Sequence, residues 1–246
     1  MAIITSRCLV LQSRPFGDTS KILRLLTVDR GPISVIARGA LRPKSRISGV
    51  TEPFAEGVAT VYMKPNRDLH TLSSFELLRA RQDLGADMSR FVTASLLCEL
   101  VLRLAPQEAD LTLFETLRSG LDVLLEVSAP EVPSASLVQI WRLVGYLGFS
   151  PALDDCFQCG RSLGPGEGAR FDTSLGGVRC TGCGGTGTRL TNEQLDLMRA
   201  FVQGRPMPGQ SVGPEQLRIL TDFVRYHPAD GLRLRSLEYL AAGLLS

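Results

Sequence analysis

Two short cysteine motifs decide how the middle of this chain folds: residues 156–160 read CFQCG and residues 180–184 read CTGCG. Each motif is a C-x-x-C pair followed by glycine, and 20 residues separate the two pairs. This spacing is typical of a tetrahedral zinc site with four thiolate ligands. The predicted ligands are Cys156, Cys159, Cys180 and Cys183. Four protein ligands leave no position open for water or substrate, so we expect one structural zinc ion per chain.

Without a metal, the segment between the two cysteine pairs has too few apolar residues to form a stable hydrophobic core. It is rich in glycine and holds few bulky apolar residues, notably Phe171 and Val178, too few to offset the entropy lost on ordering. Two disulfides or four free thiols are the alternatives. The x-x spacing with its following glycine favours zinc over both. A redox pair is expected beside a βαβ pattern, which neither motif has.

Length and composition fit an intracellular globular protein with more than one domain. The chain has 246 residues, of which 44% are hydrophobic, which is long for one core and ample for two. No secretory signal pattern opens the sequence, and no run approaches the roughly 18 apolar residues of a membrane span. We therefore expect a soluble, cytoplasmic protein. Cys8 and Cys98 lie in apolar surroundings and are expected to be core residues.

Charge is distributed unevenly along the chain. Residues 1–80 carry 12 Lys and Arg against 6 Asp and Glu, residues 81–155 carry 5 against 11, and residues 156–246 carry 10 against 8. A basic domain is typical of a module that binds a polyanion such as nucleic acid. A basic face also serves solubility, so charge alone leaves both interpretations open.

The sequence of the basic N-terminal third, residues 1–80, predicts a small barrel. Short, often β-branched runs are separated by Gly, Pro, Asp and Asn, and they cover residues 3–11, 21–27, 33–37, 57–63 and 69–77. Among five-stranded barrels, the OB-fold binds single strands in a basic groove with aromatic side chains on which bases stack. Tyr62 is the first candidate for such an aromatic and Phe16 the second. An aromatic in a small barrel is, however, more often a core residue.

A dense basic stretch follows the third predicted strand. No acidic residue lies between Arg30 and Glu52, and residues 38–46 hold four cations. Gly39 and Pro43 break regular structure, so we expect a flexible arm that contacts phosphates. A solvated loop without a ligand is the alternative, and the density of charge disfavours it. The predicted DNA-binding residues are Arg14, Lys21, Arg24, Arg38, Arg42, Lys44, Arg46, Tyr62 and Lys64.

From about residue 88 the apolar residues recur with helical periodicity. Residues 88–104 are apolar nearly all round, whereas residues 113–125 and 137–147 each carry one apolar stripe. The capping box TNEQ at residues 191–194 predicts a further helix, Pro214 begins another, and a last one follows Ser236. Its predicted apolar face comprises Leu237, Leu240, Ala241, Leu244 and Leu245. Trp141 lies on a stripe and is expected in the core.

These patterns predict an α+β multidomain fold. An OB-fold barrel occupies residues 1–80, and a helical domain occupies residues 81–246. The four-cysteine segment, residues 153–190, is inserted in the helical domain.

Catalytic motifs are missing from the sequence. Neither His70 nor His227 neighbours a nucleophile or a second set of metal ligands. No G-x-x-x-x-G-K-[ST], H-E-x-x-H or G-x-S-x-G motif occurs. We therefore expect a binding protein and not an enzyme. The alternatives are a zinc-stabilised adaptor whose basic domain binds an acidic protein partner and, more distantly, a nuclease that uses Mg²⁺ and dispersed carboxylates.

Several short strings, taken in order, resemble the bacterial RecO family of DNA recombination and repair mediators. The strings are FGDTSKIL at residues 16–23, DRG at 29–31, ARG at 37–39, KSR at 44–46, PF at 53–54, LGFSP at 147–151, the two C-x-x-C pairs and LRSL at 234–237. No single string is diagnostic. Their order along a basic β domain, a helical domain and a four-cysteine insertion is specific, and it covers essentially the whole chain.

The resemblance implies an OB-fold, a helical domain and a zinc-binding insertion in a cytosolic, nucleoid-associated protein. It also implies binding of single- and double-stranded DNA and annealing of complementary strands without ATP. With RecR, such a protein helps RecA load on DNA coated by single-strand-binding protein. The acidic tail of that last partner is expected on the helical region, which fits poorly with the negative charge of residues 81–155. Arg118 or Arg142 could still form a local pocket for it.

Overall fold

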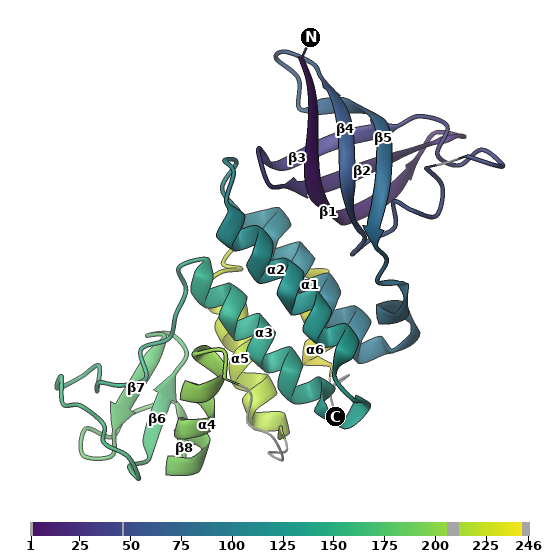
Figure 1. The fold of residues 1–246 in the computed structure, drawn as a ribbon. Helices are drawn as coiled ribbons and strands as arrows, with labels where there is room; N and C mark the ends of the chain where they lie inside the picture. Colours follow the sequence, from purple (N-terminus) through teal and green to yellow (C-terminus); the bar gives the residue numbers. More distant parts are fainter. Residues whose placement is uncertain (1, 46, 206–211, 243–246) are drawn as a thin grey trace. The chain divides into compact units, whose positions relative to one another are not determined.

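The computed structural model describes residues 2–45, 47–205 and 212–242. Figure 1 shows its helices and strands, coloured along the sequence. The chain divides into two compact units. The first unit comprises the residues up to 87 together with 98–125, and the second comprises 88–97 together with the residues from 126 onward. Within the described residues, none of the helices combines the length and the apolar character that a bilayer crossing demands.

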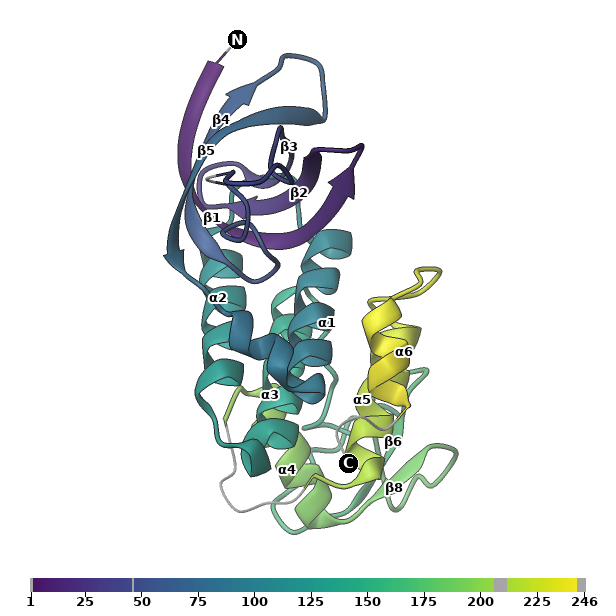
Figure 2. The ribbon, with the colours of Figure 1, turned by 90° about the vertical axis from the view of Figure 1, so that its right-hand side faces the viewer.

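The first unit is built on a closed barrel whose strands follow the order β1-β2-β3-β5-β4 (Figure 2). The strands are β1 (Ala2–Phe16), β2 (Ser20–Thr27), β3 (Gly31–Ala37), β4 (Glu56–Met63) and β5 (Leu69–Arg79). Strand β1 closes the barrel, because its first half pairs with β4 and its second half pairs with β2. Strands β3 and β5 pair in parallel. This five-stranded barrel confirms the predicted OB-fold.

Alternation along the strands separates the barrel core from its outer surface. The core includes Leu23, Leu25, Val35 and Val61, each at most 1% exposed. Their neighbours along β2 and β3 therefore point outward. Strand β1 carries a bulge between Val10 and Gln12. The extra residue reverses the alternation of side chains along β1. After the bulge, the residues of β1 that lie opposite outward-facing residues of β2 therefore also face outward.

The segment between β3 and β4, predicted to be a flexible arm, is held against the barrel. Ala40 is fully buried in the barrel core, and Ile47 and Val50 pack against the same core cluster. The amide of Leu41 donates to the carbonyl of Thr19 at 2.9 Å. The prediction of a free arm must be corrected, because buried Ala40, the Leu41 amide and the partly buried Ile47 and Val50 anchor the segment to the barrel. Within it, Leu41, Arg42 and Lys44 are exposed.

Helix α2 (Leu111–Glu126) belongs to the same unit as the barrel. After β5, the chain passes through the short helix η1 (Gln82–Ala86) into α1 (Met88–Leu104). Just before η1, the Arg81 side chain is wholly buried and pairs with Glu56 of β4 at 3.0 Å and Asp122 of α2 at 2.6 Å. This charged contact ties α2 to the barrel across the boundary predicted at residue 80.

The second unit is a helical bundle. Its elements are η2 (Ala129–Glu131), α3 (Val132–Tyr146), α4 (Asn192–Val202), α5 (Pro214–Tyr226), α6 (Arg235–Ala241) and the first part of α1. The Trp141 ring lies in the core, 2% exposed, with its centroid 5.0 Å from that of Phe223. The predicted capping box begins α4, where the Thr191 hydroxyl accepts from the Gln194 amide. Leu244 and Leu245 lie outside the described residues.

The four-cysteine segment lies between α3 and α4, where the sequence predicts an insertion, and it forms a three-stranded sheet. Its strand order is β7-β6-β8, with β6 (Ala169–Asp172), β7 (Gly177–Cys180) and β8 (Thr188–Leu190). One face buries Phe171, Val178 and Leu190. The sheet therefore has an apolar side of its own.

Candidate metal centre and candidate nucleic-acid interface

The four predicted ligands come together at the edge of this sheet. The Sγ atoms of Cys156, Cys159, Cys180 and Cys183 all lie within 4.8 Å of one another. Those of Cys159 and Cys180 are 3.9 Å apart. A tetrahedral zinc ion with Zn–S bonds of about 2.3 Å requires S···S distances of about 3.8 Å. A disulfide requires about 2.05 Å, and the cysteines are free thiols. The cluster therefore fits a metal ion.

The glycine that follows each pair makes the turn possible. Gly160 and Gly184 have φ of +70° and +61°, in the left-handed region that favours glycine. The amide of Gly160 donates to the Cys156 carbonyl at 2.8 Å, and that of Gly184 donates to the Cys180 carbonyl at 3.3 Å. Each pair is thus one tight turn, as the sequence predicts.

Backbone amides point at the sulfur atoms. The amide of Cys180 donates to the Cys156 sulfur at 3.3 Å, and the amide of Cys183 donates to the Cys180 sulfur at 3.4 Å. These bonds lower the pKa of Cys156 to about 6 and also lower the pKa of Cys180. Hydrogen bonding to the neighbouring Cys159 raises the pKa of Cys183 to about 12. A dication in the cluster would favour the thiolate at all four positions.

The candidate DNA-binding residues differ in exposure. Arg14, Arg38, Arg42 and Lys44 are exposed, whereas Arg24, Tyr62 and Lys64 are half-buried. Arg46 lies outside the described residues. Lys21 is buried, 7% exposed, and its Nζ lies 2.6 Å from Glu52 Oε1. The prediction that Lys21 lines a groove must be corrected, because its ammonium is paired within the fold.

One outer surface of the barrel collects arginines and apolar side chains. Arg14 of β1 lies opposite Ile22 of β2, which lies opposite Ile36 of β3. In the next row, Arg24 lies between Gln12 and Ser34. We define the barrel face as the outward-facing residues of β2, β3 and the half of β1 that pairs with β2, together with the adjoining residues 38–44. This adjoining segment meets the β1–β2 turn, where the Leu41 amide donates to the Thr19 carbonyl.

Phe16 ends β1 two residues after Arg14, and its side chain is 52% exposed. Residues two apart on a strand share a face, so Phe16 belongs to the barrel face. Tyr62 lies on β4, which pairs with β1 and β5 and not with β2, and its neighbours across the strands are Ile3 and Thr71. Of these two aromatics, Phe16 is the one that lies on the barrel face, and it is the more exposed.

The cations of the barrel face have no acidic partner. Among the described residues, Arg14, Arg24, Arg38, Arg42 and Lys44 form no ion pair. The Nε atom of Arg24 is buried without a hydrogen-bond acceptor. A buried donor that lacks a partner is costly unless a ligand supplies one.

Comparison with known families agrees with this arrangement. The family model described as "Recombination protein O N terminal" matches residues 1–81, and the model described as "Recombination protein O C terminal" matches residues 85–237.

The chain belongs to the RecO family.

Relatives named DNA repair protein RecO cover most of the chain. The one from Symbiobacterium thermophilum is 33% identical over 212 residues, 83% of this chain and 81% of the relative. The one from Heliobacterium modesticaldum is 30% identical over 245 residues, 95% and 88% of the two chains. The one from Anaeromyxobacter sp. strain K is 31% identical over 243 residues, 94% and 93%. The predicted resemblance is confirmed.

Sequence reasoning missed a network of charges in this RecO-family chain. It joins the barrel to α2 and comprises Arg7, Glu56, Arg79, Arg81, Glu115, Arg118 and Asp122. Arg118, a candidate for an acidic-tail pocket, pairs with Glu115 at 2.6 Å and Asp122 at 2.8 Å. Apart from the pairs that Arg118 forms within α2, the partners lie too far apart in the sequence for a local motif to reveal them.

In this RecO-family chain, the surroundings of the two histidines and of the two cysteines outside the metal centre fit structural roles. His70 is buried and its Nδ1 accepts from the Lys64 amide, whereas His227 Nε2 donates to the Thr173 carbonyl at 2.7 Å. Burial raises the pKa of both Cys8 and Cys98 to about 12, which fits core thiols.

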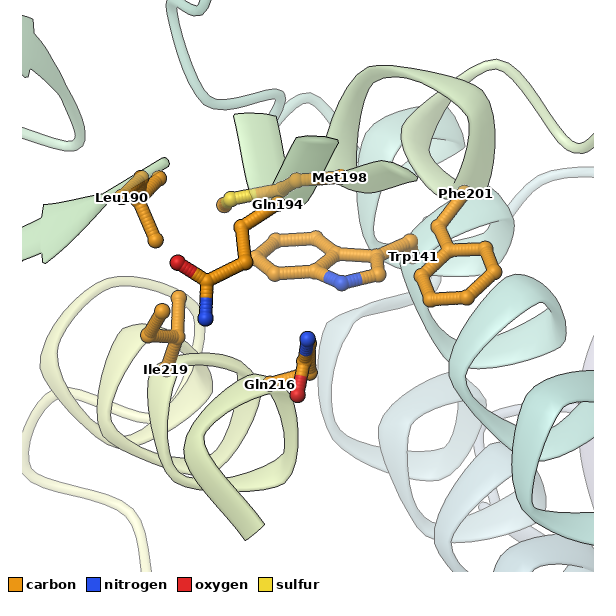
Figure 3. Close-up of a pocket in the computed structure, with 7 residues that line it drawn as sticks. All are labelled: Trp141, Leu190, Gln194, Met198, Phe201, Gln216 and Ile219. Atoms are coloured by element: carbon orange, nitrogen blue, oxygen red, sulfur yellow. The ribbon is translucent and has the colours of Figure 1, made fainter. Parts of the chain in front are cut away.

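Trp141 lines a small cavity together with Leu190, Gln194, Met198, Phe201, Gln216 and Ile219 (Figure 3). The cavity holds about 10 Å³, at the lower limit for one water molecule. Trp141 is therefore a core residue, as expected.

Proposed function

We propose that this protein is a DNA repair and recombination mediator that binds single- and double-stranded DNA through the barrel face. It anneals complementary strands without ATP and, with RecR, helps load RecA on DNA coated by single-strand-binding protein. The observation that carries the proposal is a set of arginines without acidic partners on the OB-fold of a RecO-family chain.

The contrast between paired and unpaired cations supports the barrel face as the DNA site. Arg7, Arg79 and Arg81 are neutralised by carboxylates within the fold. Arg14 and Arg24 are not, so their charge is available to phosphates. Phosphate oxygens accept strong, often bidentate bonds from guanidinium groups and would satisfy the buried Nε of Arg24.

Phe16 supplies the second element of single-strand binding. Its exposed ring lies beside Arg14 on the barrel face. Bases of any sequence stack on an aromatic ring, while cations follow the phosphates. The pair therefore suits DNA binding without sequence preference.

Strand annealing needs no catalytic group. No covalent bond forms or breaks, and a cationic surface that neutralises two strands lowers their repulsion. We therefore propose a non-enzymatic protein of the cytoplasm, associated with the nucleoid.

We also propose that Cys156, Cys159, Cys180 and Cys183 hold one structural zinc ion. The distances between their sulfur atoms support this identity. Bound zinc would join the two cysteine turns and so brace the inserted sheet.

Annealing of complementary labelled oligonucleotides by the purified full-length chain, without ATP, tests the proposal. The barrel variant, Arg14→Glu with Arg42→Glu and Lys44→Glu, is expected to anneal at least about tenfold more slowly, because three phosphate contacts are lost. A control variant with Arg103→Glu, Arg225→Glu and Arg233→Glu makes the same change in charge at other exposed arginines. Equal annealing by both variants would contradict the barrel face, and absence of DNA binding in the unmodified chain would favour an adaptor for an acidic protein.

A further inference from the structure

The inserted sheet carries one arginine on each strand, all at the same level. Arg170 of β6 lies opposite Arg179 of β7 and opposite Arg189 of β8. Neighbouring strands are about 4.8 Å apart, so the three backbone positions span about 10 Å. We call these three residues the arginine row.

The pleat sends the arginine row to one face of the sheet. The residues next to it in register, Phe171, Val178 and Leu190, are at most 2% exposed and fill the other face. Within the row, Arg189 is exposed and Arg170 and Arg179 are half-buried. The row is therefore the polar side of a sheet whose apolar side is already occupied.

Charges within the row are poorly compensated. Like charges directly opposite each other destabilise a sheet. One carboxylate, Asp172, reaches the row, 3.3 Å from the guanidinium of Arg179. Arg170 donates to the Gly187 carbonyl at 3.3 Å, and no carboxylate among the described residues pairs with Arg170 or Arg189.

A second observation indicates an absent acceptor. The Nε atom of Arg179 is buried and has no hydrogen-bond partner. Asp172 does not satisfy it, because its oxygens also accept from Ser174 and Thr186 and its contact with Arg179 is at the outer guanidinium nitrogen. The arrangement therefore retains donors and positive charge that an anion can use.

A hollow of about 500 Å³ adjoins the row. Arg170 and Arg189 line it together with Thr181, Thr191 and Asn192. Thr181 lies within the second cysteine turn, directly after Cys180. The hollow thus extends from the arginine row to the second cysteine turn of the candidate metal centre.

We propose that the arginine row and this hollow bind the sugar-phosphate backbone of a nucleic-acid strand, as a second phosphate-binding surface. A strand carries about one charge per 3.4 Å, so the row spans about three phosphates. This inference rests on the proposed function in one respect: annealing brings together two strands, and the row is a second place to hold one. A zinc ion bound by the four cysteines would order the turn that contributes Thr181, and so one wall of the hollow.

The sheet variant, Arg170→Gln with Arg179→Gln and Arg189→Gln, tests this inference in the full-length chain. Its matched control is Arg205→Gln with Arg225→Gln and Arg233→Gln, which removes the same charge at exposed arginines outside the row. For a single-stranded oligonucleotide, the slope of log K against log salt should become less steep by about 2, because about 0.7 is lost per phosphate contact. The control should keep the original slope. Sheet and control variants with equal slopes would overturn the inference.

The two proposals fail differently when the variants are combined. In the barrel variant, residual oligonucleotide binding should persist and should weaken further when the sheet substitutions are added. If the sheet substitutions change nothing in either background, the arginine row is not a binding surface, while the barrel face stands. If the barrel substitutions change nothing, the barrel face is wrong, while the row can still hold.

The inference can still be tested if the triple substitution disrupts the fold of the inserted sheet. Zinc content and thermal unfolding are measured on each variant. Should the triple variant lose its metal, Arg189→Gln alone replaces an exposed side chain and carries the test. Its expected slope is less steep by about 0.7, and an unchanged slope would overturn the inference.

Discussion

The Nε atom of Arg81 donates to the Asp122 carboxylate of α2 at 2.6 Å, and both residues are buried. The same guanidinium donates to Glu56 Oε2 of β4 at 3.0 Å and to the Phe54 carbonyl at 2.9 Å. One side chain therefore satisfies groups from a strand, a helix and a connecting segment. Because these groups are far apart in the sequence, the contact specifies how the first unit is assembled.

Removing this arginine should strongly destabilise the protein. Arg81→Ala leaves the carboxylates of Glu56 and Asp122 buried with fewer partners, and breaking such a buried pair costs about 3–5 kcal/mol. Chemical denaturation followed by circular dichroism measures the change. Arg103→Ala, at an exposed site on α1, should change the free energy of unfolding by less than about 0.5 kcal/mol. Equal midpoints for the two variants would show that the network is dispensable.

Lys21 and Arg24 point to opposite faces of β2 and should respond differently to substitution. Arg24→Gln should make the salt slope of oligonucleotide binding less steep by about 0.7, because one phosphate contact is lost. Lys21→Gln should leave this slope unchanged and lower stability instead, because Lys21 is buried against Glu52. Fluorescence anisotropy at several salt concentrations, with thermal unfolding of each variant, separates the two effects. A change of slope in Lys21→Gln would contradict the placement of this side chain.

Phe16 should contribute more to single-strand binding than Tyr62. Loss of one stacking aromatic costs about 1–3 kcal/mol, so Phe16→Ala should weaken binding about fivefold or more. Tyr62→Ala is the matched comparison, because that ring is half-buried on β4 away from the barrel face. Titration of a labelled oligonucleotide at fixed salt measures both. A larger loss for Tyr62→Ala would restore the ranking predicted from the sequence.

The metal centre should contain one zinc ion and should brace the inserted sheet. Elemental analysis of protein purified without chelator should find one zinc per chain, and Cys156→Ser should remove it. Cys98→Ala, at a buried cysteine outside the cluster, should retain the metal. Hydrogen exchange in residues 169–190 should speed up in Cys156→Ser alone, since metal and fold are linked. Full zinc content in that variant would argue against the four-cysteine site.

Local patterns in the sequence were sufficient for much of the fold. The glycine after each C-x-x-C pair, the five strand-like runs and the TNEQ capping box each depend on residues close together in the chain. The structure places these features as predicted.

Features that depend on register or long-range contacts were not visible in the sequence. The bulge in β1 decides which face Arg14 occupies. Burial of Ala40 and the packing of Ile47 against the barrel anchor a segment that was expected to be a free arm. The arginine row becomes apparent only when the three short strands are paired.

The most direct test of the account is the salt dependence of single-stranded DNA binding by the full-length chain and its barrel variant. For the unmodified chain, log K should fall linearly and steeply with log salt concentration. The Arg14→Glu, Arg42→Glu, Lys44→Glu variant should show a slope less steep by about 2, since three cations are lost from the barrel face. No binding in dilute buffer, or a slope that is the same for both proteins, would contradict the central claim that these cations hold DNA by its phosphates.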